Sequence, residues 1–433
     1  MDLLSALGRR LERVGKRARG ESAAIPLAVV LASSPLPPLS TLRHLKSLQA
    51  PGFEDVPDFE RILDGEIPSS CPPRIKRILE AAALAQQSGS SEVIVQRVEE
   101  EIDSIEVSLE LADYQLSQFY QVLSVFVTLV PSIVATMLVF VDPRAAVSTI
   151  LGLAALAVGA SLLGIVFFPG ELRLPAPPRR ALLPMVAIAP AYAAASLLGA
   201  PHPALLAVAL GSSPTAILSL SWTKEELEVL EEALELVRRA CAGARYSMKT
   251  ALRLDEREEG PEFLLSSKWF GVARGACTAL YLLAFKGGRR LEDCLARLER
   301  YTRRYVEALR KFRSRTATMM LLTTVEAAIV ALIYAVVIAT ASFFAGLATR
   351  PEFAGAGGLA YGFKLPSRED VAILESAVDL ALALDAVALA IATALCREGD
   401  PRFAPTYLPL IAGVTLASYS ASTQWAPSLF AGW

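Results

Sequence analysis

Long apolar runs alternate with charged segments along the chain. Residues 120–221 and 317–433 are mostly apolar and carry few charges, whereas residues 1–119 and 222–316 hold most of the charged side chains. A helix needs about 20 apolar residues to cross the roughly 30 Å of membrane hydrocarbon, because every backbone polar group must be satisfied within it. The pattern therefore predicts a polytopic membrane protein with seven spans, near 120–141, 145–168, 181–200, 203–222, 317–348, 371–396 and 404–422.

The same pattern divides the chain into consecutive parts. We expect a basic amphipathic helix at 1–20, helical bundles at 21–119 and 223–316, four membrane helices in 120–222, and three in 317–433 with an external loop at 349–370. The first helix would lie on the inner membrane surface or pack on its own domain, and the sequence leaves both open. Prolines in the last thirty residues also leave open a re-entrant final helix.

The short connections between the spans predict the orientation. Residues 169–180 carry three arginines and residues 396–402 carry two, whereas 142–144 carries one and 199–203 none. Lys and Arg mark the cytoplasmic side of short membrane loops. We therefore expect the N-terminus and both charged segments in the cytoplasm, and the C-terminus outside a cell membrane that the chain crosses several times.

A weak internal repeat links the two charged segments. Residues 74–109 align with 271–309 after a shift of about 198 residues, which sets Gly89 over Gly287. Each copy reads as a helix, a glycine turn and a long helix that leads into a span. We expect two duplicated antiparallel helical bundles. Because sustained period-two alternation is absent from the sequence, the fold class is predicted to be all-α.

Composition narrows the class of protein further. The 433 residues are 53% apolar and 20% charged, which is too apolar for an ordinary soluble protein. A net charge of −2 gives no reason to expect nucleic-acid binding. The five cysteines form no C-x-x-C pair and there are only two histidines, so we predict no metal site and reduced thiols.

The sequence carries no recognisable catalytic motif. Residues 243–250, GARYSMKT, resemble a phosphate-binding P-loop, but Met248 stands where a glycine must let the backbone wrap the phosphates. No hydrolase elbow of the form G-x-S-x-G is present. We predict that the chain is not an enzyme and holds no cofactor.

Four carboxylates fall within the expected spans. A charge near the bilayer centre costs at least about 2.5 to 3.5 kcal/mol, so each needs a partner or a purpose. Glu375 and Asp379 lie one helical turn apart near the outer end of their span, where solvation at the interface would suffice. Glu326 and Asp385 lie deeper in their spans. They are either neutral carboxyls that form hydrogen bonds between helices or a polar site that binds a substrate helix or a proton.

Two segments carry a resemblance to a known family. They are ESAAIPLAVVLASSPLPPLSTLRHL (21–45) and FKGGRRLEDCLARLERY (285–301). With the duplicated helical segments that each lead into a span, they resemble the type II secretion system F-domain family, the membrane platforms of type IV filament machines. The number of spans is similar to that of the archaeal pilus and archaellum branch.

The resemblance implies a non-enzymatic role. The platform would engage a hexameric secretion ATPase in the cytoplasm and pass pilin-like subunits into a filament, working in the lipid bilayer as a homo-oligomer, dimer or trimer. Basic clusters beside the repeat's first helix and its glycine turn would then face the ATPase. These candidates are Arg74, Lys76, Arg77, Gly287, Gly288, Arg289 and Arg290.

Two other classes of protein stay open. A proton-coupled secondary transporter also combines an internal repeat with intramembrane carboxylates. However, an even number of spans separates these copies, so they are not inverted. A membrane scaffold or sensor would share the helical bundles and need no pilin partner.

Overall fold

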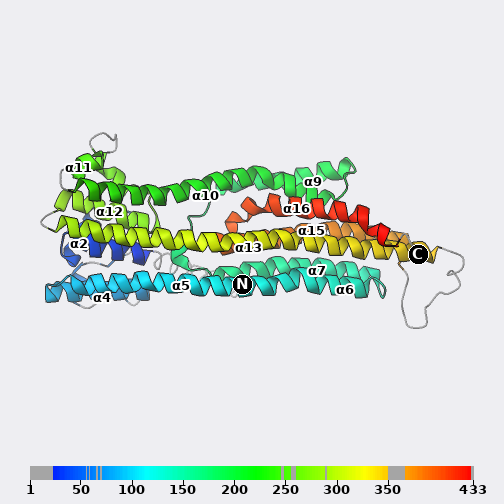
Figure 1. Cartoon of the computed structure of the whole chain (residues 1–433), viewed down its shortest axis with the longest axis horizontal. Helices are drawn as coiled ribbons and strands as arrows, with labels where there is room; N and C mark the ends of the chain where they lie inside the picture. The colour runs from blue at the N-terminus through cyan, green and yellow to red at the C-terminus, as the bar shows by residue number, and fades with distance from the viewer. Residues whose placement is uncertain are drawn as a thin grey trace, which may run out of the picture. The chain divides into compact units, whose positions relative to one another are not determined.

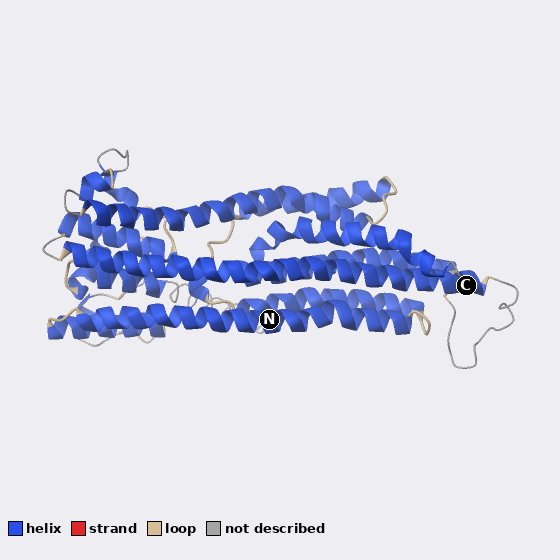
Figure 2. Ribbon diagram, viewed as in Figure 1, coloured by secondary structure: helices blue, strands red, loops and turns tan. Residues whose placement is uncertain are grey.

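A computed structural model describes residues 23–54, 56–57, 59–64, 67–68, 71–244, 248–254, 260–287, 290–349 and 366–430. The regular elements in these ranges are all helices, with no strand among them (Figure 2), which confirms the all-α prediction. The amphipathic helix expected at 1–20 and most of the external loop expected at 349–370 lie outside the described residues.

The chain divides into two compact units. The charged unit comprises residues 1–111, 169–175 and 224–312, and the apolar unit comprises 112–168, 176–223 and 313–433. Three long helices (Figure 1) contribute residues to both units: α5 (Glu92–Ser124), α10 (Pro203–Gly243) and α13 (Leu291–Ala348). The charged part of each helix belongs to the charged unit and its apolar part to the apolar unit.

The charged unit is built around a buried apolar helix, Ala23–Ser33, whose residues 24–33 are all buried. Gly275 lets α12 approach this helix, because a Cβ added there would lie 2.7 Å from the Pro26 carbonyl oxygen. The unit's other elements are α2 (Pro38–Ser47), α3 (Phe59–Leu63), α4 (Pro73–Ser88), η3 (Gly170–Leu172), α11 (Met248–Ala251), η6 (Gly260–Leu265) and α12 (Gly271–Lys286).

The two aligned segments form helices of matching length. Helices α4 and α12 both have 16 residues and begin at Pro73 and Gly271, 198 residues apart. Helix α4 ends at Gly89, whose φ of 70° is the left-handed conformation in which glycine is favoured. Helices α5 and α13 then begin at Glu92 and Leu291.

Ion pairs join α5 to α13 inside the charged unit. Arg304 Nη2 lies 2.8 Å from Asp103 and 2.9 Å from Glu106, and Arg300 lies 3.7 Å from Glu99. The partners are 198 to 201 residues apart in the sequence at every contact. A separation that stays constant along two helices means that they run parallel, so the long helices of the two copies pack side by side in register.

The apolar unit is a layered set of helices with small residues at their contacts. Helix α15 (Arg368–Arg397) packs against α7 (Pro143–Ser161) and α16 (Ala404–Trp425). One face of α15 buries Ala377, Ala381, Ala388 and Ala392, and small side chains allow close approach of membrane helices. The remaining elements are η1 (Val125–Leu129), α6 (Val130–Leu138), η2 (Leu162–Val166), α8 (Arg179–Leu182), η4 (Leu183–Ala187), α9 (Ile188–Leu197), η7 (Pro401–Phe403) and η8 (Ala426–Phe430).

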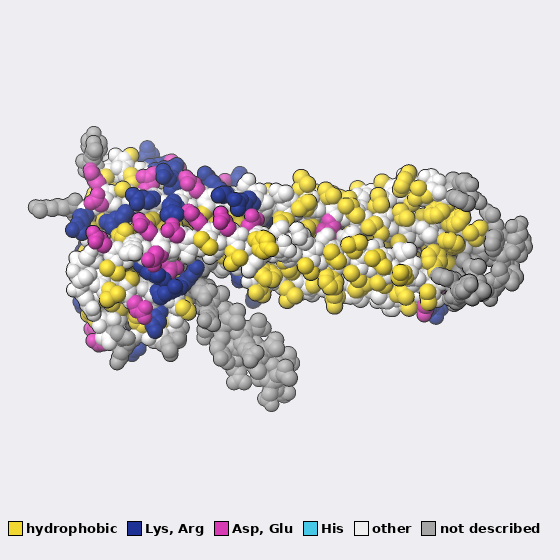
Figure 3. Space-filling model, turned by 60° about the horizontal axis from the view of Figure 1, so that its bottom comes forward, with side chains coloured by type: hydrophobic (Ala, Val, Ile, Leu, Met, Phe, Trp, Pro, Cys, Tyr) yellow, Lys and Arg dark blue, Asp and Glu magenta, His cyan; other side chains and the backbone are white. Residues whose placement is uncertain are grey.

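Six described helices are long and apolar enough to cross a membrane, as expected of a multi-pass membrane protein. They are Glu92–Leu138, Pro143–Val166, Arg179–Leu197, Pro203–Gly243, Leu291–Leu347 and Arg368–Arg397. Figure 3 shows hydrophobic side chains over the visible face of the apolar unit and charged side chains over that of the charged unit. Each of these six overlaps one of the first six expected spans, and four of them end one to three residues before the expected end.

The seventh expected span needs correction. Residues 404–422 do form a helix, α16. Because Ser, Thr and Pro recur along it, its mean hydropathy is too low for a membrane span, unlike that of the other six. Among the described residues, length and composition allow a seventh span if the bent pair Ala23–Ser33 and Pro38–Ser47, turned by 120°, counts as one. That pair belongs to the charged unit.

Candidate functional site

A buried carboxylate ties the two repeat-derived helices together inside the apolar unit. Glu326 of α13 is only 7% exposed. Its Oε2 accepts a hydrogen bond of 2.5 Å from the Tyr120 hydroxyl of α5, and its Oε1 accepts one of 2.8 Å from the Thr128 hydroxyl. Both oxygens of Glu326 therefore have an O–H donor.

The π-helix η1 explains how Tyr120 and Thr128 reach the same side chain. At 3.6 residues per turn, positions eight residues apart on an α-helix point about 80° away from each other. A π turn accommodates one extra residue in the helix. A residue eight positions after Tyr120 therefore points in nearly the direction that a residue seven positions after it would have in a regular α-helix. Pro131 follows directly, and its missing N–H removes a backbone hydrogen bond in this region.

Asp385 of α15 lies deeper than Glu326 and is differently surrounded. Its side chain is 2% exposed, and neither carboxyl oxygen has a hydrogen-bond partner in the part of the chain that the structure describes. Asp385 lies within the range of electrostatic interaction of both Glu326 and the Tyr334 hydroxyl. The Tyr334 hydroxyl, 1% exposed, also lacks a described partner. The structure therefore brings together the two deep carboxylates of the sequence analysis.

Asp379 differs from the expectation of solvation at the interface. Its side chain is 4% exposed, and it accepts hydrogen bonds from the backbone N–H groups of Ala204 at 2.7 Å and Leu205 at 3.3 Å. These N–H groups open α10 and have no partner within that helix. Asp379 thus caps α10 from another helix, while Glu375, one turn away, is exposed as expected.

The basic candidates of the first repeat copy lie in the charged unit with unequal exposure. Arg74 is 20% exposed in its side chain and lies 3.6 Å from the buried Glu101. Lys76 is 49% exposed and pairs with Glu80, and Arg77 is exposed. Arg74 and Lys76 therefore both have partners within the chain, but only Lys76 and Arg77 present their side chains largely to solvent.

The second copy exposes its glycine turn. Gly287 and Arg290 are exposed, and Gly288 and Arg289 lie outside the described residues. Next to the turn, Phe285 is 40% exposed and Lys249 lies 5.0 Å from its ring centre. An exposed aromatic ring beside basic side chains is suited to protein contact.

A thiol beside Lys76 reports on the charge of this region. Burial raises the pKa of the Cys71 thiol above its ordinary value, and the positive charge of Lys76 offsets part of that rise. Cys71 is partly exposed, so a reagent in water can reach it.

Sequence reasoning missed a polar cluster between α15 and α16. Glu398 is 1% exposed, and its Oε1 accepts hydrogen bonds from Tyr407 at 2.7 Å and Arg313 at 3.3 Å. Burial raises the pKa of the Glu398 carboxyl, and Arg313 and Tyr407 oppose that rise. In the sequence, Glu398 looks like an ordinary charged residue of a short loop. The only indication that it is buried is that apolar segments lie on both sides of this loop.

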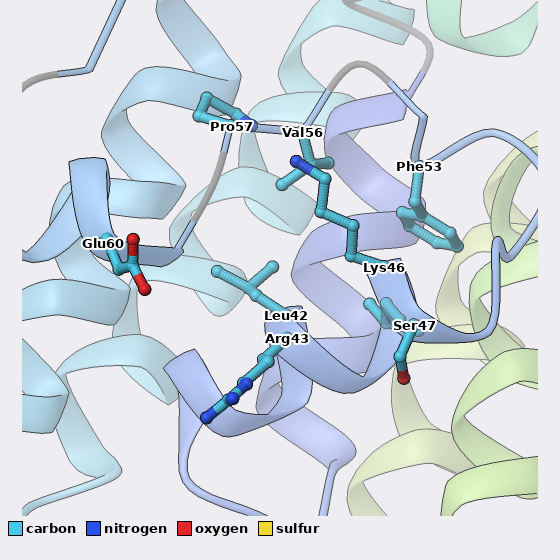
Figure 4. Close-up of a pocket in the computed structure, with 9 residues that line it drawn as sticks. Leu42, Arg43, Lys46, Ser47, Phe53, Val56, Pro57 and Glu60 are labelled. Carbon is cyan, nitrogen blue, oxygen red and sulfur yellow. The ribbon is translucent and has the colours of Figure 1, made fainter.

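The sequence also gave no sign of a cavity on the charged unit. A hollow of about 310 Å³ lies between α2 and residues 53–60 (Figure 4). Its wall combines apolar side chains, among them Leu42, Phe53 and Val56, with the charged Arg43 and Glu60. Phe53, Val56 and Pro57, from the segment between α2 and α3, face α2 across this cavity.

Comparison with models of protein families, with curated proteins and with solved structures gives no match for this chain. Among the described residues, no three His, Cys, Asp or Glu side chains gather as a metal ion would require.

Proposed function

We propose that the chain is the membrane platform of a type IV filament or secretion machine. A cytoplasmic hexameric ATPase acts on its charged unit, and pilin-like subunits pass along its apolar helices into the filament. The observation that carries this proposal is the pair α5 and α13. Each follows a short helix and a turn, each continues from charged to apolar sequence, and the two pack in parallel register.

The helix pair suggests how force reaches the membrane. The Glu99–Arg300 and Asp103–Arg304 ion pairs join α5 and α13 in the charged unit, and Tyr120 and Glu326 join them in the apolar unit. An ATPase that displaces the charged parts of these helices would move both together. The pilin-like subunits, as apolar helices, would be handed along the surface of the apolar unit. The ATPase surface would include Lys76, Arg77, Gly287 and Arg290.

The orientation proposed from the arginines has support in the charged unit. Residues 169–175 connect two apolar helices yet belong to the charged unit, where Leu172 and Leu174 are 3% and 4% exposed. This connection would therefore share the cytoplasmic side with the charged segments. Loop 349–370, between the fifth and sixth spans, would then lie outside. The C-terminus would lie outside if α16 crosses the membrane, and in the cytoplasm if it does not.

Gene deletion tests the function. Loss of the gene should remove surface filaments or the secreted protein, while pilin-like subunits stay in the membrane, and the intact gene should restore assembly. Filaments that persist at wild-type numbers in the deletion strain would rule out the platform role.

A charge reversal tests the ATPase surface. Arg290→Glu should weaken binding of the secretion ATPase to the purified protein about tenfold, equal to 1.4 kcal/mol, because arginines are frequent energetic centres of interfaces. Arg303→Glu is the matched control, since Arg303 is exposed in the same unit and contacts Glu307 of its own helix. Equal ATPase affinity for both variants would remove Arg290 from the interface.

The buried carboxyls favour a second candidate, a proton-coupled transporter. Asp385 and Glu326 lie near each other inside the apolar unit, where such carriers place ionisable groups. Reconstituted protein that moves protons in response to a solute gradient would favour the carrier. If the deletion strain keeps its filaments and the reconstituted protein moves no protons, the scaffold or sensor would be the remaining class.

A further inference from the structure

Among the described residues, no hydrogen-bond donor reaches either carboxyl oxygen of Asp385. Its side chain is 2% exposed. An isolated carboxylate in an apolar interior is so unfavourable that the group takes up a proton instead.

In the part of the chain that the structure describes, the helices packed against α15 supply no cation close to Asp385. Arg397 lies twelve residues away at the end of α15, and Arg402 of η7 pairs with Asp400. Helix α13 presents Glu326 and Tyr334, neither of which is positively charged. The only charged residue of α7 is Arg144, which is exposed at the start of that helix. Helix α16 carries no charged residue, and its Tyr407 already donates to Glu398. Two carboxylates close together without a cation disfavour double ionisation.

The hydrogen bonds distinguish the two carboxyls. Both oxygens of Glu326 accept from hydroxyl donors, Tyr120 and Thr128. Both oxygens of Asp385 lack a donor, and the Tyr334 oxygen, itself without a described partner, is within electrostatic range. A proton on Asp385 lets the acid donate a hydrogen bond to a nearby oxygen, whereas a proton on Glu326 would compete with the two donors already bonded to it.

We propose that the apolar unit is a binding site for a single proton, which resides on Asp385 and not on the neighbouring Glu326. The neutral acid lets α15 pack beside α13. Release of the proton leaves an unpartnered negative charge on Asp385 in the apolar interior and weakens that packing. The contact between α15 and α13 therefore depends on whether the proton is bound. The inference concerns the apolar unit alone and holds for a platform and for a carrier.

Infrared spectroscopy of the full-length protein in lipid nanodiscs tests this site. At neutral pH the wild-type protein should show the C=O stretching band of a protonated carboxyl, separate from the carboxylate bands. Asp385→Asn should remove that band, and Glu326→Gln should retain it. Glu375→Gln is the matched control, an exposed carboxyl on the same helix whose loss should leave the band unchanged.

Isotope labelling keeps the test independent of whether the variants fold. Carboxyl-¹³C aspartate incorporated into the wild-type protein should shift the band, and carboxyl-¹³C glutamate should not. The proposal is overturned if the folded wild-type protein lacks a protonated-carboxyl band at neutral pH. It is equally overturned if the glutamate label shifts the band or if Asp385→Asn retains it.

Discussion

At the scale of single residues, Asp379 shows how a membrane helix can be capped from outside itself. Helix α10 begins with Pro203 and offers no side chain of its own to its first N–H groups, so Asp379 of α15 accepts from Ala204 and Leu205. The negative charge also lies at the positive end of the helix dipole. A residue 175 positions away therefore completes the start of α10.

Replacement of Asp379 should destabilise the protein measurably. Asp379→Ala leaves the N–H groups of Ala204 and Leu205 without an acceptor, and loss of an N-cap costs about 1 kcal/mol. We expect a lower melting temperature in detergent. Asp379→Asn keeps an acceptor oxygen and should lose less, and Glu375→Ala, on the exposed face of the same helix, should have no effect. Equal melting temperatures for Asp379→Ala and Glu375→Ala would refute the capping role.

The Cys71 thiol offers a test of pH dependence in the charged unit. Because burial raises the pKa of Cys71, its reactive thiolate should form at higher pH than that of a free cysteine. The rate of maleimide labelling, followed at this site by mass spectrometry, should therefore rise at correspondingly higher pH. Lys76→Gln removes the charge that opposes the shift and should move the curve further up. Arg303→Gln is the control, and a curve unaffected by Lys76→Gln would contradict this account.

Residue roles were the least predictable level from sequence. The four intramembrane carboxylates stand out individually, because charges are costly in apolar runs. Their partners do not, since Tyr120 lies 206 residues from Glu326 and Ala204 lies 175 from Asp379. Glu398 was missed because a glutamate in a short polar loop is normally solvated.

At the scale of helices, the first six apolar segments were located well because hydrophobicity summed over about twenty residues is a strong signal. The long helices expected to lead into the first and fifth spans are α5 and α13, and α10 likewise continues past the expected end of its span, to Gly243. In the charged parts of these helices, buried apolar residues still recur at helical spacing, as Ile94, Val98 and Ile102 do in α5. Charged pairs four residues apart, such as Arg303 with Glu307, add further support. The π-helix η1 has no comparable sequence signal beyond Pro131.

Close packing of two helices in the charged unit depends on Gly275. A Cβ at this position would lie 2.7 Å from the Pro26 carbonyl oxygen and 2.8 Å from its Cα, and backbone atoms must shift to admit it. Gly275→Ala should therefore lower the melting temperature, although alanine favours helix over glycine by about 1 kcal/mol.

Gly152 of α7 provides the matched control for that substitution. A Cβ there would meet no atom within 4 Å, so Gly152→Ala should leave the melting temperature unchanged or raise it. A stabilising Gly275→Ala would show that α12 and the helix Ala23–Ser33 are not in tight contact.

At the scale of the whole chain, the internal repeat determines which helices correspond and which of them pair. A shift of about 198 residues, read from weak similarity, aligns helices of equal length and matches the spacing of the contacts between α5 and α13. Sequence predicted the all-α class and most of the spans. It could not predict that the two long helices lie side by side, because that arrangement depends on pairings between residues far apart in the chain.

The most direct test of the platform account is to identify what the protein binds in its native membrane. The full-length chain, tagged and solubilised gently, would be purified and its partners identified by mass spectrometry. The account predicts that a P-loop secretion ATPase and pilin-like subunits co-purify with it. Reproducible absence of the ATPase, together with solute-dependent proton flux by the purified protein in liposomes, would contradict the account.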